Sequence, residues 1–329
     1  MTALVTGAAG FIGSHVAEQL LAAGTEVVAL DDLSGGFADN IPTGAIFYEG
    51  TVLDKALLQR IFSDHKIETV YHLAAYAAEG LSHFIRAYNY ENNVVGSMNV
   101  LNESIKAEVR CFVFTSSIAV YGANQTPMTE SLVPTPEDPY GVAKYSVELD
   151  LAAAQHMFGL NYVIFRPHNV YGERQHIGDR YRNVIGIFMN QLMSGQPMTI
   201  FGDGTQSRGF TYIADVAPII ARAPDVPQAL GQVFNVGADT ATTLNELALL
   251  VADAMGLPCE TKHLPGRKEV LHALADHEKV ARVFDYRSQH DLKHGLTRMA
   301  AWAKAAGPRK PTTFQNIEVL RNLPASWRT

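Results

Sequence analysis

The fold class is decided by the stretch Ala3-Leu4-Val5-Thr6-Gly7-Ala8-Ala9-Gly10-Phe11-Ile12-Gly13. A short apolar run leads into three glycines, each three residues after the last, and residues 11–22 continue with helical periodicity. Glycine suits a tight turn at which the backbone must approach a pyrophosphate, and the N–H groups at the start of the helix face that anion. The stretch therefore predicts a strand, a dinucleotide-binding turn and a helix.

An acidic pair, Asp31-Asp32, follows at the end of the second predicted strand. A carboxylate at this place can accept hydrogen bonds from the adenosine ribose and would repel a 2′-phosphate. Residues 31–40 contain no lysine or arginine that could compensate. NAD is therefore favoured over NADP, and the alternative of a purely structural turn with solvated acids fits this spacing less well.

Short β-branched or apolar runs alternate with longer helical patterns through the first half of the chain. Strands are predicted at 3–5, 26–30, 45–48, 69–72, 111–114 and 162–165, and helices at 11–22, 55–64, 93–106 and 140–157. The strands lack polar alternation, as expected when helices cover both faces of a parallel sheet. We expect an α/β fold with a Rossmann-like, doubly wound parallel sheet, in which residues 1–166 form the NAD-binding domain.

After residue 166 the alternation breaks into loops rich in glycine, proline and arginine. Helices are predicted near 184–193, 244–255, 276–284 and 292–305, and strands near 198–201 and 233–236. These are too few for a second complete parallel sheet. We expect residues 167–329 to form mainly a smaller α/β lobe that binds substrate, with chain crossings between the lobes and an irregular tail at 307–329 whose role cannot be predicted.

Composition excludes several classes of protein. The chain has 329 residues, is 47% hydrophobic and 18% charged, and carries a net charge of −7, which offers no electrostatic footprint for nucleic acid or an anionic membrane. Its two cysteines, Cys111 and Cys259, exclude a disulfide framework and a four-cysteine zinc site, and its 12 histidines show no metal-ligand spacing. With neither a signal peptide nor an apolar run of membrane-spanning length, a cytoplasmic protein without a metal is expected.

Tyr140 and Lys144 lie four positions apart, on one face of a predicted helix. A free phenol is a weak base at neutral pH, and lowering its pKa by about three units requires about 4 kcal/mol of differential stabilisation of the phenolate. Lys144 and a nearby cationic nicotinamide could supply this stabilisation together. Taken alone, however, the pair is common by chance and more typical of a solvated helix face.

A hydroxyl cluster, Thr115-Ser116-Ser117, ends the strand that begins at Cys111. Ligands of open α/β sheets bind at the carboxyl ends of the strands, where a hydroxyl can hold a substrate oxygen beside the phenol. Ser117 is our candidate for this role. The alternative is a serine that merely caps the end of the strand.

These motifs together resemble a known family. They are Gly7-x-x-Gly10-x-x-Gly13, His72-Leu73-Ala74-Ala75, Asn93, Ser116 to Gly122, Tyr140-x-x-x-Lys144, Arg166-Pro167-His168-Asn169-Val170-Tyr171-Gly172 and Arg208-Gly209-Phe210-Thr211-Tyr212-Ile213-Ala214-Asp215. The chain resembles the extended short-chain dehydrogenase/reductases over about residues 1–285, and among them the nucleotide-sugar epimerases and dehydratases such as the UDP-glucose 4-epimerases.

The resemblance implies a role for each site residue. Ser117 and Tyr140 would meet the 4-hydroxyl of the sugar, and Lys144 would bind the nicotinamide ribose. The residues that would contact NAD are Gly7, Gly10, Phe11, Ile12, Gly13, Asp31, Asp32, Leu33, Val52, Leu73, Ala74, Ala75, Asn93, Tyr140, Lys144 and His168. Those that would hold a nucleoside diphosphate sugar, most simply a UDP-sugar, are Ser117, Asn169, Asn183, Val184, Phe201, Arg208 and Arg267. The arginines suit this role because guanidinium forks match phosphate oxygens.

The residues after Ser117 narrow the implied reaction. Related 4,6-dehydratases carry Asp-Glu there, related decarboxylases a glutamate and related 3,5-epimerases a cysteine at the second position, whereas this chain has Ile118-Ala119. The resemblance therefore implies 4-epimerisation, in which tightly bound NAD takes a hydride from C4 and returns it to the opposite face. Another group such as Glu79 could still act, so a glucuronate epimerase, a dehydratase or a 4-keto reductase stays open, as does a non-catalytic NAD-sensing scaffold.

The sugar itself is less well determined. Ala273 aligns with a position that gates the C2 substituent in the family, and a small residue there would leave room for an N-acetyl group or reflect ordinary packing. A hexuronate would need a cation near C6, for which Arg86, Arg180 and Arg182 are candidates. Thr51, Tyr76 and Gly209 depart from the family pattern. A homodimer is expected from the family alone.

Overall fold

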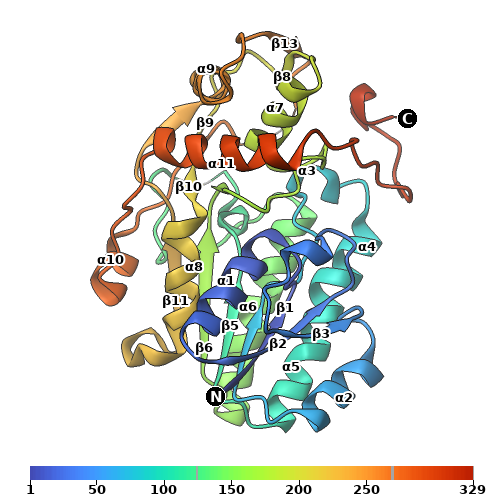
Figure 1. Cartoon of the computed structure of the whole chain (residues 1–329). Helices are drawn as coiled ribbons and strands as arrows, with labels where there is room; N and C mark the ends of the chain where they lie inside the picture. The colour runs from blue at the N-terminus through green and yellow to red at the C-terminus, as the bar shows by residue number, and fades with distance from the viewer. Residues whose placement is uncertain (124, 268–269, 329) are drawn as a thin grey trace.

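Seven parallel strands form the central sheet of the computed structural model, within the residues that it describes, 1–123, 125–267 and 270–328. They are β1 (Thr2–Thr6), β2 (Glu26–Asp31), β3 (Ile46–Glu49), β4 (Thr69–His72), β5 (Cys111–Thr115), β6 (Tyr162–Pro167) and β11 (Gln232–Val236), in the spatial order β11-β6-β5-β4-β1-β2-β3 (Figure 1). The strand order reverses direction between β1 and β4, which is the place where ligands of doubly wound sheets bind.

Helices cover both faces of the sheet. Successive residues of β1 point to opposite faces, so Ala3 and Val5 enter one core and Leu4 enters the other. The first core is closed by α1 (Phe11–Ala22) and α8 (Ile213–Arg222), and the second by α2 (Lys55–Asp64), α5 (Gly96–Lys106) and α6 (Pro139–Phe158) (Figure 1). Because each fully buried aliphatic side chain contributes about 1.5–3 kcal/mol, these two cores hold the sheet in place. The predicted doubly wound α/β fold is confirmed.

The helix α6 corresponds to the helix predicted at 140–157 and is one residue longer at each end. Asp138 caps it by accepting a hydrogen bond from the backbone N–H of Gly141 at 2.9 Å, and Pro139 occupies the first turn. Gly159 ends the helix in the left-handed conformation. Tyr140 therefore sits in the first turn, at the end of the helix that faces the carboxyl edge of the sheet.

The helix predicted at 93–106 starts differently. A continuous helical path runs from α4 (Arg86–Tyr90) through a π-helical turn, η2 (Glu91–Val95), into α5. The side chain of Asn93 accepts from the backbone N–H of Tyr76 at 2.8 Å and donates to its carbonyl at 3.1 Å. These long-range hydrogen bonds hold the wider, π-helical turn against the segment at Tyr76, and helical periodicity does not reveal them. Such turns often lie beside functional sites.

Beyond β6 the chain forms a second, smaller lobe over the carboxyl edge of the sheet (Figure 1). Its helices are α7 (Val184–Met193), α9 (Leu244–Met255), α10 (Glu278–Phe284) and α11 (Leu292–Ala306). Its strands pair as β10 (Thr211–Tyr212) with β7 (Val170–Tyr171), β13 (Thr261–Leu264) with β8 (Met198–Phe201), and β9 (Ser207–Gly209) with both β12 (Ala241–Thr243) and β14 (His272–Ala273). Short helices complete the chain: η1 (Ala38–Asn40), α3 (Glu79–Ser82), η3 (Ile118–Tyr121), η4 (Ala223–Asp225), η5 (Pro227–Ala229) and η6 (Ala325–Trp327).

The chain crosses between the two lobes more than once. After it enters the second lobe it returns to add α8 to the helix layer beside α1 and β11 to the edge of the central sheet beside β6. A single boundary at residue 166 would therefore separate two elements from the layers that they complete. The division of the chain into two domains at residue 166 therefore stays a prediction.

The tail predicted at 307–329 is irregular apart from η6, and Thr329 lies outside the described residues. It nevertheless packs against the rest of the protein, because Leu323 and Trp327 are buried together with Leu81, Ile85 and Tyr181. In the part of the chain that the structure describes, no helix has both the length and the apolar character needed to cross a membrane.

Candidate active site

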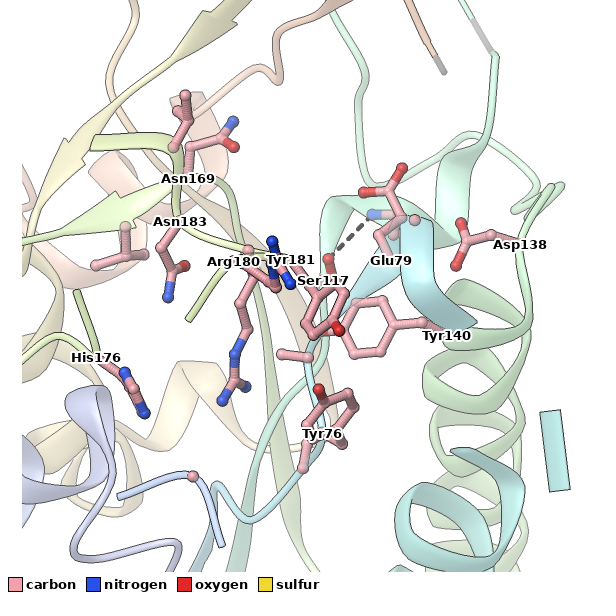
Figure 2. Close-up of a pocket in the computed structure, with 18 of the residues that line it drawn as sticks. Tyr76, Glu79, Ser117, Asp138, Tyr140, Asn169, His176, Arg180, Tyr181 and Asn183 are labelled. Carbon is pink, nitrogen blue, oxygen red and sulfur yellow. Dashed lines mark hydrogen bonds between the residues drawn. The ribbon is translucent and has the colours of Figure 1, made fainter. Parts of the chain in front are cut away.

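A cleft of about 1480 Å³ lies between the carboxyl edge of the sheet and the second lobe. We call the side built by residues up to Lys144 the cofactor wall and the side built by residues from Pro167 onward the substrate wall. Figure 2 shows Ser117 and Tyr140 projecting from the first, with Asn169, His176 and Asn183 on the other side of the view. The polar groups of both halves of the chain therefore converge on one space.

The glycine turn of the cofactor wall is as tight as its sequence predicts. Gly7 has a φ of +72°, and a Cβ there would lie 2.7 Å from the backbone nitrogen of Ala74. A Cβ on Gly13 would lie 2.0 Å from the carbonyl oxygen of Gly7. Gly10, which has no side chain to cap the helix, leaves the start of α1 open toward the cleft. This geometry fits a dinucleotide, whose pyrophosphate would meet the N-terminus of α1.

Asp31 lies beneath this turn and fixes its shape. Its carboxylate accepts the backbone N–H of Ala9 at 3.0 Å and that of Leu33 at 2.8 Å. Burial raises the pKa of Asp31, and these two hydrogen bonds oppose that effect. Asp31 and Asp32 both line the cleft, and each carboxylate oxygen has a second lone pair with which it can accept a ribose hydroxyl.

Most of the other residues predicted to contact NAD also line the cleft. These are Phe11, Ile12, Val52, Leu73, Ala74, Ala75 and His168. Thr51, which departs from the family pattern, lines the cleft as well. Leu33 and Asn93 are not among the described lining residues: the Leu33 backbone supports Asp31, and the buried side chain of Asn93 is held by Tyr76 and Asn89.

The three candidate catalytic residues come together at the base of the cleft. Ser117 lies close enough to Tyr140 for its hydroxyl to lower the pKa of the phenol, and it accepts the backbone N–H of Ala119 at 3.1 Å. Lys144 lies one helical turn below the phenol, with its Nζ 5.8 Å from the centre of the Tyr140 ring. Its ammonium group donates to the carbonyl of Thr115 at 2.8 Å. The strand end and the helix start thus hold these groups in a fixed relation.

Burial dominates the protonation of this group. It raises the pKa of Tyr140, and the hydrogen bond from Ser117 and the charge of Arg182 offset that rise only in part. Burial also lowers the pKa of Lys144 to about 7, so that near neutral pH the charged and neutral forms of its amine are both populated. Lys144 alone therefore does not acidify the phenol. Further positive charge in the cleft would be needed to do so.

A buried ion pair supports this helix from below. The guanidinium of Arg166 donates to both carboxylate oxygens of Glu148, at 3.0 and 2.5 Å, and Ser116 donates to the same carboxylate. Arg166 also donates to the Tyr121 hydroxyl at 2.7 Å. Glu148 lies one further turn below Lys144, so the network joins α6 to the ends of β5 and β6. No local pattern in the sequence predicts this network.

Several charged groups surround the phenol. The charges of Glu79 and Asp138 raise the pKa of Tyr140, and Figure 2 shows both near Ser117 and Tyr140. Arg182 donates to Asp179 at 2.7 Å and lies 5.0 Å from the centre of the Tyr76 ring. Arg180 lines the cleft as well, whereas Arg86 lies on α4 and is not among the described lining residues. Arg180 and Arg182, two of the three arginines that could bind the C6 carboxylate of a hexuronate, therefore line the cleft.

The substrate wall contains all six of its predicted residues: Asn169, Asn183, Val184, Phe201, Arg208 and Arg267. Asn169 and Asn183 adopt positive φ values of 43° and 66°, which asparagine tolerates. Arg208 is held by the carbonyls of Ser207, Val270 and Leu271. The guanidinium carbon of Arg267 lies 3.8 Å from the centre of the Phe201 ring.

One departure from the family pattern has a steric explanation. His168 stacks on His277, with their Nε2 atoms 2.8 Å apart, and burial together with this neighbour lowers the pKa of His168 to about 3. A Cβ on Gly209 would already lie 2.7 Å from the His168 ring. An acidic side chain at residue 209 would extend further into the same space, so glycine there accommodates the buried pair of imidazoles.

His83, His176, Tyr181 and Trp327 are among the lining residues that the sequence does not predict. The first three lie in segments without helical or strand periodicity. Trp327 comes from the tail, almost at the end of the chain, and nothing in its local sequence connects it with residues near position 80 or 267. Only its aromatic character amid a polar tail could have signalled that it packs against something.

Comparisons with known proteins identify the family. The model of the NAD dependent epimerase/dehydratase family matches residues 3–237. A putative UDP-glucose 4-epimerase of Methanocaldococcus jannaschii is 34% identical over 304 residues, covering 92% of this chain and 98% of the relative. A UDP-glucose 4-epimerase of Mycolicibacterium smegmatis is also 34% identical, over 91% of this chain and 97% of the relative.

Solved structures agree. The UDP-glucose 4-epimerase of Thermotoga maritima with UDP-glucose has a TM-score of 0.88 at 36% identity, covering 93% of this chain and 99% of that chain. The UDP-glucuronic acid 4-epimerase of Bacillus cereus, with UDP-glucuronic acid and NAD, has a TM-score of 0.86 at 29% identity, covering 93% and 100%. The family and the cofactor predicted from the sequence are confirmed: the chain belongs to the NAD-dependent epimerase/dehydratase family.

Proposed function

We propose that this protein is a UDP-hexose 4-epimerase that oxidises C4 transiently with tightly bound NAD. The observation that carries the proposal is the Ser117–Tyr140 pair, with Lys144 one turn below it and with Ile118 and Ala119 beside it. The pair can take and return one proton, while the side chains of Ile118 and Ala119 cannot transfer any. This set of groups suits a reaction that needs a single acid/base at one carbon.

In this mechanism Tyr140 removes the proton of the 4-hydroxyl while Ser117 holds the same oxygen. Bound NAD would supply the acceptor and donor of the C4 hydride, and its positively charged ring would supply the charge that Lys144 alone does not provide. Lys144 is anchored by Thr115 in a position to contact a ribose hydroxyl and to stabilise the phenolate. After the keto sugar has rotated in the cleft and presents its opposite face, Tyr140 returns the proton to the same oxygen.

The substrate wall suits a nucleoside diphosphate. Arg208 and Arg267 bring two guanidinium groups to one side of the cleft, and Phe201 offers an aromatic face there. Guanidinium forks match phosphate oxygens, and a base can stack on an aromatic ring. The relatives whose names specify a nucleotide sugar act on UDP-sugars, which supports UDP as the nucleotide.

We propose glucose as the sugar, and two observations are also compatible with other sugars. Ala273 is small and lines the cleft, which leaves room for an N-acetyl group at C2. Arg180 and Arg182 line it too and could bind a C6 carboxylate. UDP-N-acetylglucosamine and UDP-glucuronate should therefore be compared directly with UDP-glucose.

A second candidate function rests on Glu79. This carboxylate lies in the cleft close enough to affect the pKa of Tyr140, so it could serve as an additional acid or base. Elimination of water or net oxidation would then become accessible. A dehydratase would release water, and a net oxidoreductase would change NADH stoichiometrically, so the products distinguish both from an epimerase.

The deciding experiment uses purified protein shown to contain NAD. It is incubated without added NAD with UDP-glucose, UDP-N-acetylglucosamine and UDP-glucuronate in turn, and the products are identified by NMR. We expect the C4 epimer of at least UDP-glucose at unchanged total NADH. Recovery of starting sugars alone from all three incubations would refute the proposal and favour an NAD-sensing scaffold.

We also propose that the protein is a cytoplasmic homodimer. Leu149, Met157 and Phe158 on α6 are exposed, as is Val95 at the end of η2, which leads directly into α5, and α5 and α6 pack against each other. Two cysteines without a disulfide suit a reducing compartment. Light scattering of the native protein and of Leu149→Glu would test the dimer, and cell fractionation would test the location. A monomeric native protein, or one recovered outside the cytoplasm, would contradict the corresponding part.

A further inference from the structure

The C-terminal tail forms part of the cleft. Seven of its residues line the cavity: Val319, Arg321, Asn322, Pro324, Ala325, Ser326 and Trp327. They lie more than 300 positions from the glycine turn in the sequence, and Figure 1 shows the tail leaving α11 and returning beside α3. The cavity at this end is therefore closed by a segment that neither helical nor strand periodicity predicts.

The tail is anchored at several points along its length. Arg309 donates its backbone N–H to the side chain of Asn190 at 2.8 Å, and Thr312 donates to the Gly178 carbonyl at 2.8 Å. Further on, the Glu318 carboxylate accepts the backbone N–H groups at residues 87 and 88, at 2.8 and 2.9 Å, at the start of α4. These contacts hold the last turn over the cleft in one place.

Trp327 is the best-packed residue of this turn. Only 4% of it is exposed, its ring lies 5.2 Å from that of Tyr181 in a T-shaped arrangement, and a Cβ on Gly80 would come within 3.3 Å of it. Trp327 also contacts the substrate wall. The guanidinium carbon of Arg267 lies 5.3 Å from the centre of the Trp327 ring.

Arg267 thus contacts two aromatic rings, Phe201 at 3.8 Å and Trp327 at 5.3 Å. These contacts restrict the orientations that the flexible Arg267 side chain can adopt, and a guanidinium packed on aromatic faces directs its N–H groups along its edge. Phe201 and Trp327 come from opposite ends of the second half of the chain. Arg267 can therefore adopt this arrangement only when the tail is docked.

We propose that Trp327 is a positioning residue for the diphosphate group of the substrate, acting through Arg267. The inference rests on the proposed UDP-sugar site and extends it to the tail. A ring that only filled the small core with Leu81 and Tyr181 would not need to contact an arginine of the cleft. Because a cation–π contact of this kind is modest, its loss should weaken UDP binding about 3- to 30-fold.

The experiment exploits the fact that the chain has only two tryptophans, Trp302 and Trp327. Trp302 packs against the core on the α1 side of the sheet, so Trp302→Phe is the matched control. UDP is titrated into the NAD-containing protein, followed by tryptophan fluorescence and by calorimetry. We expect UDP to change the fluorescence of Trp302→Phe, with a wild-type Kd, and to leave that of Trp327→Phe unchanged, with a Kd 3- to 30-fold higher.

A double-mutant cycle separates positioning from simple stability. Arg267→Lys keeps the charge and loses the planar group, so Trp327→Phe should add little to the Kd of Arg267→Lys if Trp327 acts through Arg267. Additive effects, or a wild-type Kd for Trp327→Phe, would overturn the inference. Calorimetric binding of UDP does not require turnover. A protein that binds UDP in this way and epimerises no sugar would therefore refute the proposed function and leave this inference standing.

Discussion

The cofactor wall and the substrate wall enclose the same cleft, but the chain builds them differently. The cofactor wall consists of strand ends and helix starts that follow each other directly, so Gly7 to Gly13 and Tyr140 to Lys144 are placed by regular elements. The substrate wall collects Asn169, Phe201, Arg267 and Trp327 from separate loops, a strand end and the tail. Local geometry determines the first wall, whereas long-range contacts determine the second.

This difference bears on where chemistry and specificity reside. Groups that move a proton must be held within a narrow range of positions, and regular elements supply that rigidity. Groups that select a nucleotide or a sugar can be exchanged on loops without disturbing the sheet. We therefore expect substitutions in the cofactor wall to change kcat and those in the substrate wall to change KM.

The largest expected effect tests that contrast directly. Tyr140→Phe removes the acid/base and should lower kcat for UDP-glucose by about 10²- to 10⁴-fold, with bound NAD and KM close to those of the wild type. Tyr145→Phe, on the same helix, is the matched control and should stay within about twofold. Steady-state kinetics with NAD quantification provides the measurement. Equal activity of both variants would remove Tyr140 from the mechanism.

The next effect concerns the buried pair beneath the cofactor wall. Glu148→Gln leaves the guanidinium of Arg166 buried without a countercharge, which should reduce the free energy of unfolding by about 3–5 kcal/mol. Asp225→Asn breaks the exposed pair with Arg110 and should cost at most about 1 kcal/mol. Urea unfolding measures both. Similar losses for the two variants would show that the buried network has no special role.

A smaller effect is expected at the glycine turn. Asp31→Asn leaves one of the two backbone donors, at Ala9 or Leu33, facing an amide N–H group, and we expect NAD to bind about 10- to 100-fold more weakly. Asp32→Asn retains an oxygen for its single backbone donor at Ser34 and should change binding less. NAD dissociation followed by fluorescence compares them. The reverse order would mean that Asp32 carries the main cofactor contact.

The last expected effect, the smallest when taken per pH unit, depends on pH. Burial lowers the pKa of His72 to about 3, so between pH 6.5 and 3 the unfolded chain binds a proton that the folded protein does not. Stability should therefore fall with falling pH by up to about 1.4 kcal/mol per pH unit for this residue, and by a similar amount for His168. His72→Gln should reduce the slope measured by urea unfolding at pH 4–7. An unchanged slope would assign the acid sensitivity to other groups.

The sequence predicted the cofactor wall almost completely because its signals are local. Each strand, turn and helix there is encoded by neighbouring residues, and the spacing from Tyr140 to Lys144 places both on one helix face. What the sequence does not reveal there are contacts with distant partners. Asn93 stays a predicted NAD residue, and the structure adds that its amide is engaged by the backbone of Tyr76. Leu33 stays one as well, and its backbone supports Asp31.

By itself, the sequence determined the doubly wound fold, the dependence on NAD and the helix that carries Tyr140 and Lys144, because hydrophobic periodicity and glycine spacing act within a few residues. Only the tertiary structure decided that Glu148 and Arg166 pair in the core, that His168 stacks on His277, and that Trp327 reaches Arg267. These contacts join residues far apart in the chain. Their energies depend on burial and on relative position, which no local pattern records.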